Sequence, residues 1–175
     1  MTSKMMIRQT TPSDTALIRA FYPQTFPDED LRPVVSALLK EGPQVLSLAS
    51  FEGDALVAHV LFTLCTTKNQ NQTGALLGPL GVLPSHQRQG LGDAIVRNGL
   101  GRLEKSGVSQ VFVLGDPGYY QRFGFAPERQ VLAPYPLPAE YGDAWQSMPL
   151  AARAPLLAGQ LSLPEPWMDA ALWGP

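Results

Sequence analysis

Cysteine and histidine are scarce in this 175-residue chain, which has one cysteine and two histidines. A single cysteine, Cys65, excludes an internal disulfide framework and fits a reducing compartment, so we expect a cytoplasmic protein. The apolar residues around Cys65 predict a core position rather than a catalytic thiol. Because the only histidines are His59 and His86, we expect neither a zinc site nor another bound metal.

Charge clusters and long apolar runs are lacking too. The net charge is −2 and lysine and arginine form no run, so nucleic acid is not an expected partner. Residues 1–6 begin no long apolar stretch, so neither a signal peptide nor a membrane span is predicted. The hydrophobic fraction of 45% and the charged fraction of 16% are typical of a globular protein. The length predicts a single domain over residues 1–175.

Apolar periodicity predicts an alternation of strands and helices. Strands are expected at residues 7–10, 45–50, 55–66, 75–82 and 108–114 and from Phe125 onward. Helices are expected after the capping residues 11–14, from residues 27–30 to Leu39, from Leu91 to Lys105 and, briefly, from Pro117. A polar loop is expected at residues 67–72. This order predicts an α/β (α+β) fold with a mixed central sheet flanked by helices.

The composition changes in the tail, residues 130–175, which holds eight of the seventeen prolines and all three tryptophans. Prolines at this density favour extended chain, so we expect a C-terminal extension packed on the core with one or two short strands. Its aromatic residues are interpreted either as a cover for a substrate site or as the face of a homodimer, and the sequence leaves both open.

The segment from Val82 to Gly92 joins an apolar strand to an amphipathic helix and contains a Gln-x-x-Gly-x-Gly pattern. Gly90 and Gly92 leave the backbone open to a ligand, because neither carries a Cβ atom. The helix that follows offers unpaired amide groups and the positive end of its dipole, which together favour a phosphate. Side-chain donors precede the helix, and Arg88 can pair with phosphate oxygens in forked geometry. The sequence therefore predicts a pyrophosphate site formed by Gln87, Arg88, Gln89, Gly90, Leu91, Gly92 and Asp93.

Two other phosphate-binding loops are disfavoured. A P-loop requires Lys-Ser or Lys-Thr after its last glycine, and neither follows Gly92. A dinucleotide-binding fingerprint requires a third small residue three positions after Gly92, where Ile95 stands, and it begins directly at the end of the strand. Here a polar loop containing Pro84 intervenes.

The Val-x-Pro-x-x-Gln-x-x-Gly-x-Gly string over residues 82–92 resembles the acyl-CoA pyrophosphate loop of the GNAT superfamily of N-acetyltransferases. The resemblance covers residues 6–128 and implies the GNAT fold, in which the strands at 76–82 and 108–114 run parallel and splay apart. It also implies acetyl-CoA as co-substrate, whose pantetheine arm would bind at Leu80, Gly81 and Val82. The acetyl group would pass directly to a primary amine, of a small molecule or of a protein.

A second segment, Gly115 to Phe125, follows a nearly continuous apolar strand. Asp116 is a good helix N-cap, and Gly124 fits the left-handed residue that closes a helix. The Tyr-Tyr-x-Arg-Phe-Gly-Phe string resembles the GNAT segment that supplies the general acid, and with the tail it resembles the YhbS-like branch. The resemblance assigns the general acid to Tyr120. It adds Gly115, Tyr119 and Phe123 to the cofactor-binding residues.

A phenol at this position suits the chemistry of the reaction. Attack of an amine on the thioester expels a CoA thiolate, whose conjugate acid has a pKa of roughly 8.5. A tyrosine with a pKa of about 10 can donate a hydrogen bond and then a proton as that charge develops. The alternative is that Tyr119 and Tyr120 are packing residues, and this alternative stays open for both.

One expected part of the site is missing. Many GNAT members place a carboxylate on the strand before the pyrophosphate loop, yet residues 75–82 contain no ionisable side chain. The acceptor ammonium would then lose its proton to water, to His59 or to one of the acidic residues 28–30. Two further functions stay open: an acyl-CoA-binding module without turnover, and a transferase for a different acyl chain.

Overall fold

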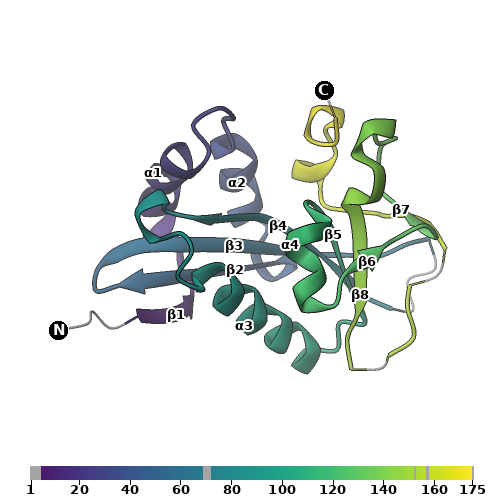
Figure 1. Cartoon of the computed structure of the whole chain (residues 1–175), viewed down its shortest axis with the longest axis horizontal. Coiled ribbons are helices and arrows are strands. Elements are labelled where there is room, and N and C mark those ends of the chain that lie inside the picture. The colour runs from purple at the N-terminus through teal and green to yellow at the C-terminus, as the bar shows by residue number, and fades with distance from the viewer. Residues whose placement is uncertain (1–4, 69–71, 152, 157, 175) are drawn as a thin grey trace. The chain divides into compact units, whose positions relative to one another are not determined.

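The computed structural model describes residues 5–68, 72–151, 153–156 and 158–174, so part of the loop expected at 67–72 lies outside the described residues. Up to residue 127 the elements follow the expected order (Figure 1). They are β1 (Met5–Gln9), α1 (Thr15–Thr25), α2 (Arg32–Leu39), β2 (Val45–Glu52), β3 (Ala55–Cys65), β4 (Gly74–Val82), α3 (Leu91–Lys105), β5 (Gln110–Leu114), α4 (Pro117–Tyr120) and β6 (Ala126–Pro127). The tail adds β7 (Val131–Leu132), β8 (Trp145–Pro149) and β9 (Gly159–Gln160).

Seven strands form one mixed sheet in the order β1-β2-β3-β4-β5-β8-β6, and β7 pairs with β9 in a second, two-stranded sheet. The predicted α/β fold with a mixed sheet is confirmed. By its contacts the chain divides into two compact units. The first unit comprises Met1–Phe62 and Pro79–Leu100, and the second comprises Thr63–Gly78 and Gly101–Pro175.

In the first unit, α1 and α2 lie on one face of β2 and β3, and α3 lies on the other (Figure 1). The apolar stripe predicted for α3 is confirmed, since Ile95 and Val96 are fully buried. Gly99 lies against the ring of Phe62, where a Cβ atom would collide with the ring. Close packing of α3 on β3 therefore depends on glycine at this position.

The predicted start of α2 at residues 27–30 is wrong, because it is too early. The helix begins at Arg32, and the acidic residues expected to open it form the turn that precedes it. The carboxylate of Asp30 accepts a hydrogen bond from the Arg32 amide at 3.1 Å, and Pro33 occupies the first turn. A proline favours that position because the missing amide has no intrahelical partner there.

The second unit is held together by the tail. Strand β8 of the tail enters the main sheet, where it pairs antiparallel with β5 and with β6. More of the tail is strand than expected, because β8 supplies five residues to the sheet and β7 and β9 pair with each other. The core that forms around it comprises Cys65, Leu76, Phe112, Val131, Ala133, Trp145, Leu156, Leu161, Leu163 and Trp173.

All three tryptophans of the tail are interior or half-buried, and each indole has a hydrogen-bond acceptor. Trp145 donates to the carbonyl of Val131 at 2.8 Å, and Trp173 donates to the carbonyl of Trp167 at 2.9 Å. Trp167 itself donates to the hydroxyl of Thr63 at 3.0 Å. These rings therefore contribute to the packing of the second unit, and both roles that the sequence left open for the tail aromatics stay predictions.

Candidate functional site

The loop expected to bind pyrophosphate leads from the end of β4 to the start of α3 within the first unit. Leu83 still donates to the carbonyl of Val57 on β3 at 2.9 Å, and the chain then makes one 3-10 turn at Pro84–His86. The side-chain amide of Gln87 donates to the carbonyl of Val82 at 3.1 Å. Gln87 therefore fixes the entry of the loop in this structure, while its predicted contact with phosphate stays a prediction.

The backbone after Gln87 contains two residues with a positive φ. Arg88 has a φ of 63° and Gly90 a φ of 82°, so both residues lie in the left-handed region. A residue with a side chain rarely adopts this conformation, and successive turns of this kind direct amide groups to one side as an anion-binding concavity. Residues 87–90 are exposed, so a ligand can reach these amides.

The start of α3 adds amide donors to this loop. The first helical hydrogen bond runs from the amide of Ala94 to the carbonyl of Gly90 at 3.0 Å. The amides of Leu91 and Gly92 thus belong to the first turn, whose N–H groups are not used by the helical hydrogen-bond pattern. These half-buried residues complete the site predicted from Gln87 to Asp93.

The end of β4 was expected to bind the pantetheine arm. Its parallel ladder with β5 covers only residues 74–77, and Gly78 follows with a φ of 143°. This interruption was not predicted, although Gly78-Pro79 is a recognisable signal for one inside a strand. Beyond it, Leu80, Gly81 and Val82 have no partner in that ladder.

Gly81 lies beneath two aromatic rings of the first unit. A Cβ atom at this position would stand 3.2 Å from the ring of Phe21 and 3.0 Å from the ring of Phe26. Any larger residue would displace one of these rings from β4. Glycine at position 81 thus lets the C-terminal end of α1 approach the strand predicted to bind the cofactor.

The predicted acid, Tyr120, closes the short helix α4 in the second unit. Both predicted helix signals are confirmed, because the Asp116 carboxylate accepts from the Gly118 amide at 2.9 Å and Gly124 has a φ of 109°. A Cβ atom on Gly115 would lie 2.5 Å from the Tyr120 ring. The Gly115 position thus makes room for Tyr120, while its predicted cofactor contact stays a prediction.

Aromatic neighbours surround the Tyr120 ring. The ring centroids of Tyr119, Phe125 and Phe123 lie 5.0, 5.7 and 6.2 Å away. Burial raises the pKa of Tyr120, and the neighbouring Tyr119 raises it further. The hydroxyl is therefore protonated throughout the physiological range and is available as a hydrogen-bond donor.

Tyr119 is held differently. The Arg122 guanidinium lies over its ring at 4.3 Å, and the Arg122 Nε donates to its carbonyl at 2.9 Å. Phe123 is buried beside it, with the two ring centroids 5.6 Å apart. Tyr119 and Phe123 therefore support the Tyr120 ring, and their contacts with a cofactor stay predictions.

His59 lies in the interior of the first unit, where it is fully buried. Its Nδ1 is 2.7 Å from the hydroxyl of Tyr22 and its Nε2 is 2.8 Å from the hydroxyl of Ser47. Burial lowers the pKa of His59 to about 3. Because both ring nitrogens are engaged and the ring has no access to solvent, His59 does not accept the proton of the acceptor amine. No sequence pattern predicts this Tyr22–His59–Ser47 chain.

The buried His59 makes folding stability depend on pH. Above about pH 6.5, histidine is neutral in both folded and unfolded chains, and below it only the unfolded chain takes up the proton readily. Between pH 6.5 and about 3, the pKa of folded His59, we expect the free energy of unfolding to fall by about 1.4 kcal/mol per pH unit from this residue. Urea denaturation at pH 7.0, 6.0 and 5.0 measures this slope.

Two variants separate the charge of His59 from its hydrogen bonds. His59→Gln should lose this slope together with some stability at pH 7, because Gln cannot take up a proton and pairs less well with Tyr22. Ser47→Ala should also lose stability but keep the slope, since the buried imidazole is still present. An unchanged slope in His59→Gln would show that another group titrates.

The acidic residues proposed as alternatives lie in the turn before α2. Asp30 forms an ion pair with Arg32 at 2.8 Å, and Asp28 and Glu29 are exposed.

In the described part of the chain, no group of three or more His, Cys, Asp and Glu side chains is arranged to hold a metal ion. None of the described helices has the length and apolar character needed to cross a membrane.

Comparison with known proteins gives the family. Residues 15–125 match the acetyltransferase (GNAT) family. The chain is 34% identical over 171 residues to YjhQ of Escherichia coli strain K12, described as an uncharacterized N-acetyltransferase, with 93% of this chain and 94% of YjhQ covered. It is 30% identical over 122 residues to YhbS of the same strain, described in the same way, with 69% of this chain and 73% of YhbS covered.

Two solved structures share the architecture over nearly the whole chain. The crystal structure of YhbS from Escherichia coli in complex with CoA has a TM-score of 0.84 at 26% identity. The match covers 97% of this chain and 94% of the YhbS chain. The structure of a GNAT family acetyltransferase from Brucella melitensis in complex with acetyl-CoA has a TM-score of 0.77 at 26% identity. That match covers 94% of this chain and 99% of the Brucella chain. The predicted GNAT fold is thereby confirmed. The chain belongs to the acetyltransferase (GNAT) family and is an N-acetyltransferase.

Proposed function

We propose that this protein binds acetyl-CoA and transfers its acetyl group directly to a primary amine. The observation that carries the cofactor assignment is the left-handed backbone of Arg88 and Gly90 at the start of α3. There the loop and the first helical turn present their amides to an exposed surface. The CoA and acetyl-CoA bound to the two related structures support the same ligand here.

The other contacts that we propose run along acetyl-CoA from its pyrophosphate to its thioester. The pyrophosphate would lie on residues Gln87 to Asp93. The pantetheine would pair with the backbone of Leu80 and Val82, as an added strand does, because the ladder with β5 ends at Leu77. One amide of the interrupted strand would polarise the thioester carbonyl.

In the chemical step, the acceptor nitrogen attacks the thioester carbon, a C–N bond forms and the C–S bond breaks. The electron pair of the C–S bond stays on sulfur, which takes the proton of the Tyr120 hydroxyl. The attacking nitrogen loses one N–H proton as the amide forms, and that proton returns to Tyr120 through water. The acceptor ammonium gives its proton to water, because residues 75–82 offer no carboxylate and His59 is buried. The raised pKa of Tyr120 keeps its hydroxyl protonated, so that it can donate a hydrogen bond to the sulfur before the C–S bond breaks.

We also propose an acceptor, a domain organisation and a cellular compartment for this enzyme. The acceptor is an amine of a small molecule or of a protein, and neither nucleic acid nor membrane takes part. Both units are taken as one acetyltransferase domain. The single cysteine is buried as a free thiol, which favours a reducing compartment such as the cytoplasm. A homodimer stays a hypothesis.

Thermal denaturation with acetyl-CoA tests the proposal. At about 100 times Kd, binding adds about 2.7 kcal/mol, which raises Tm by roughly 5–10 °C in a chain of this size. ATP and NAD at the same concentration should not shift Tm. Release of free CoA thiol in a screen of primary amines then measures turnover.

The other outcomes decide between the alternatives. A shift with another acyl-CoA but none with acetyl-CoA would change the donor. A shift without thiol release across small-molecule and peptide amines would favour a binding module that performs no transfer. Absence of a shift with every CoA species would overturn the proposal.

A further inference from the structure

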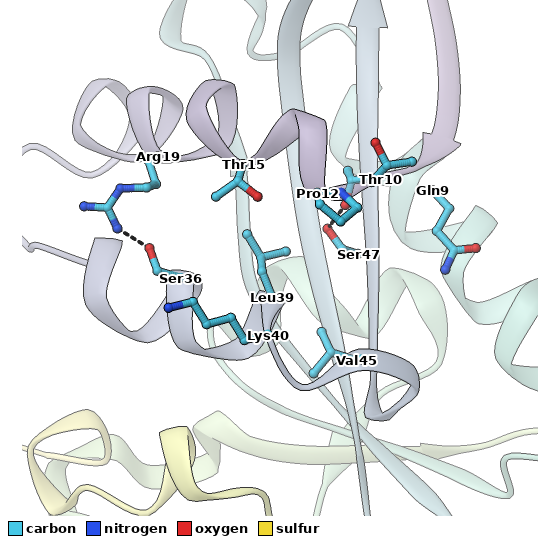
Figure 2. Close-up of a pocket in the computed structure, with 12 residues that line it drawn as sticks. Gln9, Thr10, Pro12, Thr15, Arg19, Ser36, Leu39, Lys40, Val45 and Ser47 are labelled. Carbon is cyan, nitrogen blue, oxygen red and sulfur yellow. Dashed lines mark hydrogen bonds between the residues drawn. The ribbon is translucent and has the colours of Figure 1, made fainter.

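The first unit also contains a cavity. Its lining residues include none of those in the proposed pyrophosphate loop. An open cavity of about 690 Å³ is formed by the end of β1, the first half of α1, the end of α2 and the start of β2 (Figure 2). Sites for small molecules have volumes in this range. None of the residues Leu80–Val82 or Gln87–Asp93 lines the cavity, so the proposed cofactor contacts leave it free.

The charge in the cavity is positive. Arg19 of α1 and Lys40 at the end of α2 line it, and no acidic side chain is among the described lining residues. Figure 2 shows Arg19 donating to the hydroxyl of Ser36, which fixes the guanidinium between the two helices and leaves further N–H groups to donate. The nearby carboxylate of Asp30 is already paired with Arg32.

This charge also decides what the cavity does not bind. An amine acceptor carries a positive charge at pH 7, and the two cations repel it. A carboxylate or phosphate, in contrast, would gain charge-assisted hydrogen bonds from Arg19 and Lys40. The cavity is therefore suited to an anion rather than to the ammonium group of the acceptor.

The wall formed by the end of β1, Thr10 and the start of β2 is polar. Thr10 donates its hydroxyl proton to the Ser47 hydroxyl at 2.6 Å, and Ser47 in turn contacts His59 at 2.8 Å. Ser47 and His59 are more than nine-tenths buried, and Tyr22 holds the other side of the imidazole. With its proton committed, the Thr10 oxygen presents lone pairs that accept a hydrogen bond from a ligand hydroxyl. Groups fixed by such supporting contacts make an ordered binding surface.

The other wall is apolar, because Pro12, Leu39 and Val45 also line the cavity. A ligand that meets all three surfaces carries an anionic group, at least one hydroxyl and a carbon skeleton. We propose that this cavity binds a small polyhydroxylated anion, of the class of a sugar phosphate or a sugar acid. The anion contacts Arg19 and Lys40, and the hydroxyls contact the wall at Thr10.

Calorimetric titration tests the proposal on protein saturated with CoA, which keeps phosphate from the pyrophosphate loop. Glucose 6-phosphate, gluconate and uncharged glucose are the probes. At least one of the two anions should bind with a Kd at or below the millimolar range, and glucose should bind at least about tenfold more weakly. The anion that binds identifies the charged group.

Variants then locate the site. Arg19→Gln combined with Lys40→Gln should weaken binding of that anion by at least about tenfold. Lys105→Gln, on the exposed last turn of α3, removes a positive charge elsewhere and should leave binding unchanged. Melting temperatures near that of the wild type would show that the variants are folded.

Three results would overturn the proposal: no binding of either anion up to about ten millimolar, equal binding of glucose, or unchanged anion binding in the Arg19 and Lys40 variant. Acetyl-CoA binding and turnover are measured separately on the same samples. Failure of the cavity proposal is thus distinct from failure of the proposed transferase activity.

Discussion

Gly90→Val is expected to weaken acetyl-CoA binding by about a hundredfold or more. Gly90 has a φ of 82°, and a residue with a Cβ atom pays roughly 1–2 kcal/mol to adopt such a left-handed conformation, or more when it is branched at that atom. Apart from the two chain neighbours of Gly90, no atom of the described residues lies within 4 Å of a Cβ added there. The larger part of the loss therefore comes from the valine side chain, which occupies the space where phosphate would contact the backbone.

Gly53→Val is the matched control for this variant. Gly53 has a φ of 59° in the β2–β3 turn, and a Cβ added there would also meet no atom within 4 Å in the described part of the chain, its two chain neighbours aside. The substitution imposes comparable backbone strain in the same unit without adding a side chain to residues 87–93, although the neighbouring Glu52 carboxylate lies 3.3 Å from His86 at the entry of the loop. We expect it to lower Tm while calorimetry finds wild-type acetyl-CoA affinity. If Gly90→Val binds acetyl-CoA as tightly as Gly53→Val does, the pyrophosphate assignment to residues 87–93 is wrong.

The parts of the fold that the sequence predicted well are those governed by local rules. The β2–β3 hairpin follows from the turn at Gly53, the apolar face of α3 follows from its period, and α4 follows from Asp116 and Gly124. Each depends on residues within one turn or one helix face, so no distant contact was needed to predict it. The strand-to-helix junction from Val82 to Gly92 belongs to this group, since its motif occupies eleven consecutive residues, while its binding of pyrophosphate stays a prediction.

The parts that could not be predicted depend on contacts between distant residues. Strand β8 pairs with β5 although 31 residues separate Leu114 from its partner Trp145, and no short motif encodes that register. The start of α2 was misplaced because three acidic residues suit a first helical turn, whereas the ion pair of Asp30 with Arg32 and the position of Pro33 favour a later start.

Buried polar groups show the same limit. His59 in an apolar strand could have been a base, a ligand or a structural residue, and only the contacts with Tyr22 and Ser47 exclude the first role. The Arg19 and Lys40 cavity combines four elements, so it has no signature along the sequence. Gly115 was assigned to the cofactor by resemblance, and the structure adds that its missing Cβ accommodates the Tyr120 ring.

Tyr120→Phe is expected to lower kcat by about 10²–10⁴-fold, the range that a positioned acid contributes. The substitution removes only the hydroxyl, and the ring that packs on Phe125 and Gly115 is retained. Folding stability and acetyl-CoA affinity should therefore stay near the wild-type values. Steady-state kinetics at saturating acetyl-CoA, combined with calorimetry, separates the two quantities.

Tyr141→Phe is the matched control, because Tyr141 is a half-buried tyrosine of the tail to which no role is assigned. It should keep wild-type kcat. If Tyr120→Phe instead retains full turnover, Tyr120 is a packing residue and another donor protonates the thiolate. A loss of acetyl-CoA affinity with unchanged kcat would place the hydroxyl in binding rather than in chemistry. A fall in kcat alone is the result required of an acid, since the thiolate forms only as the C–S bond breaks.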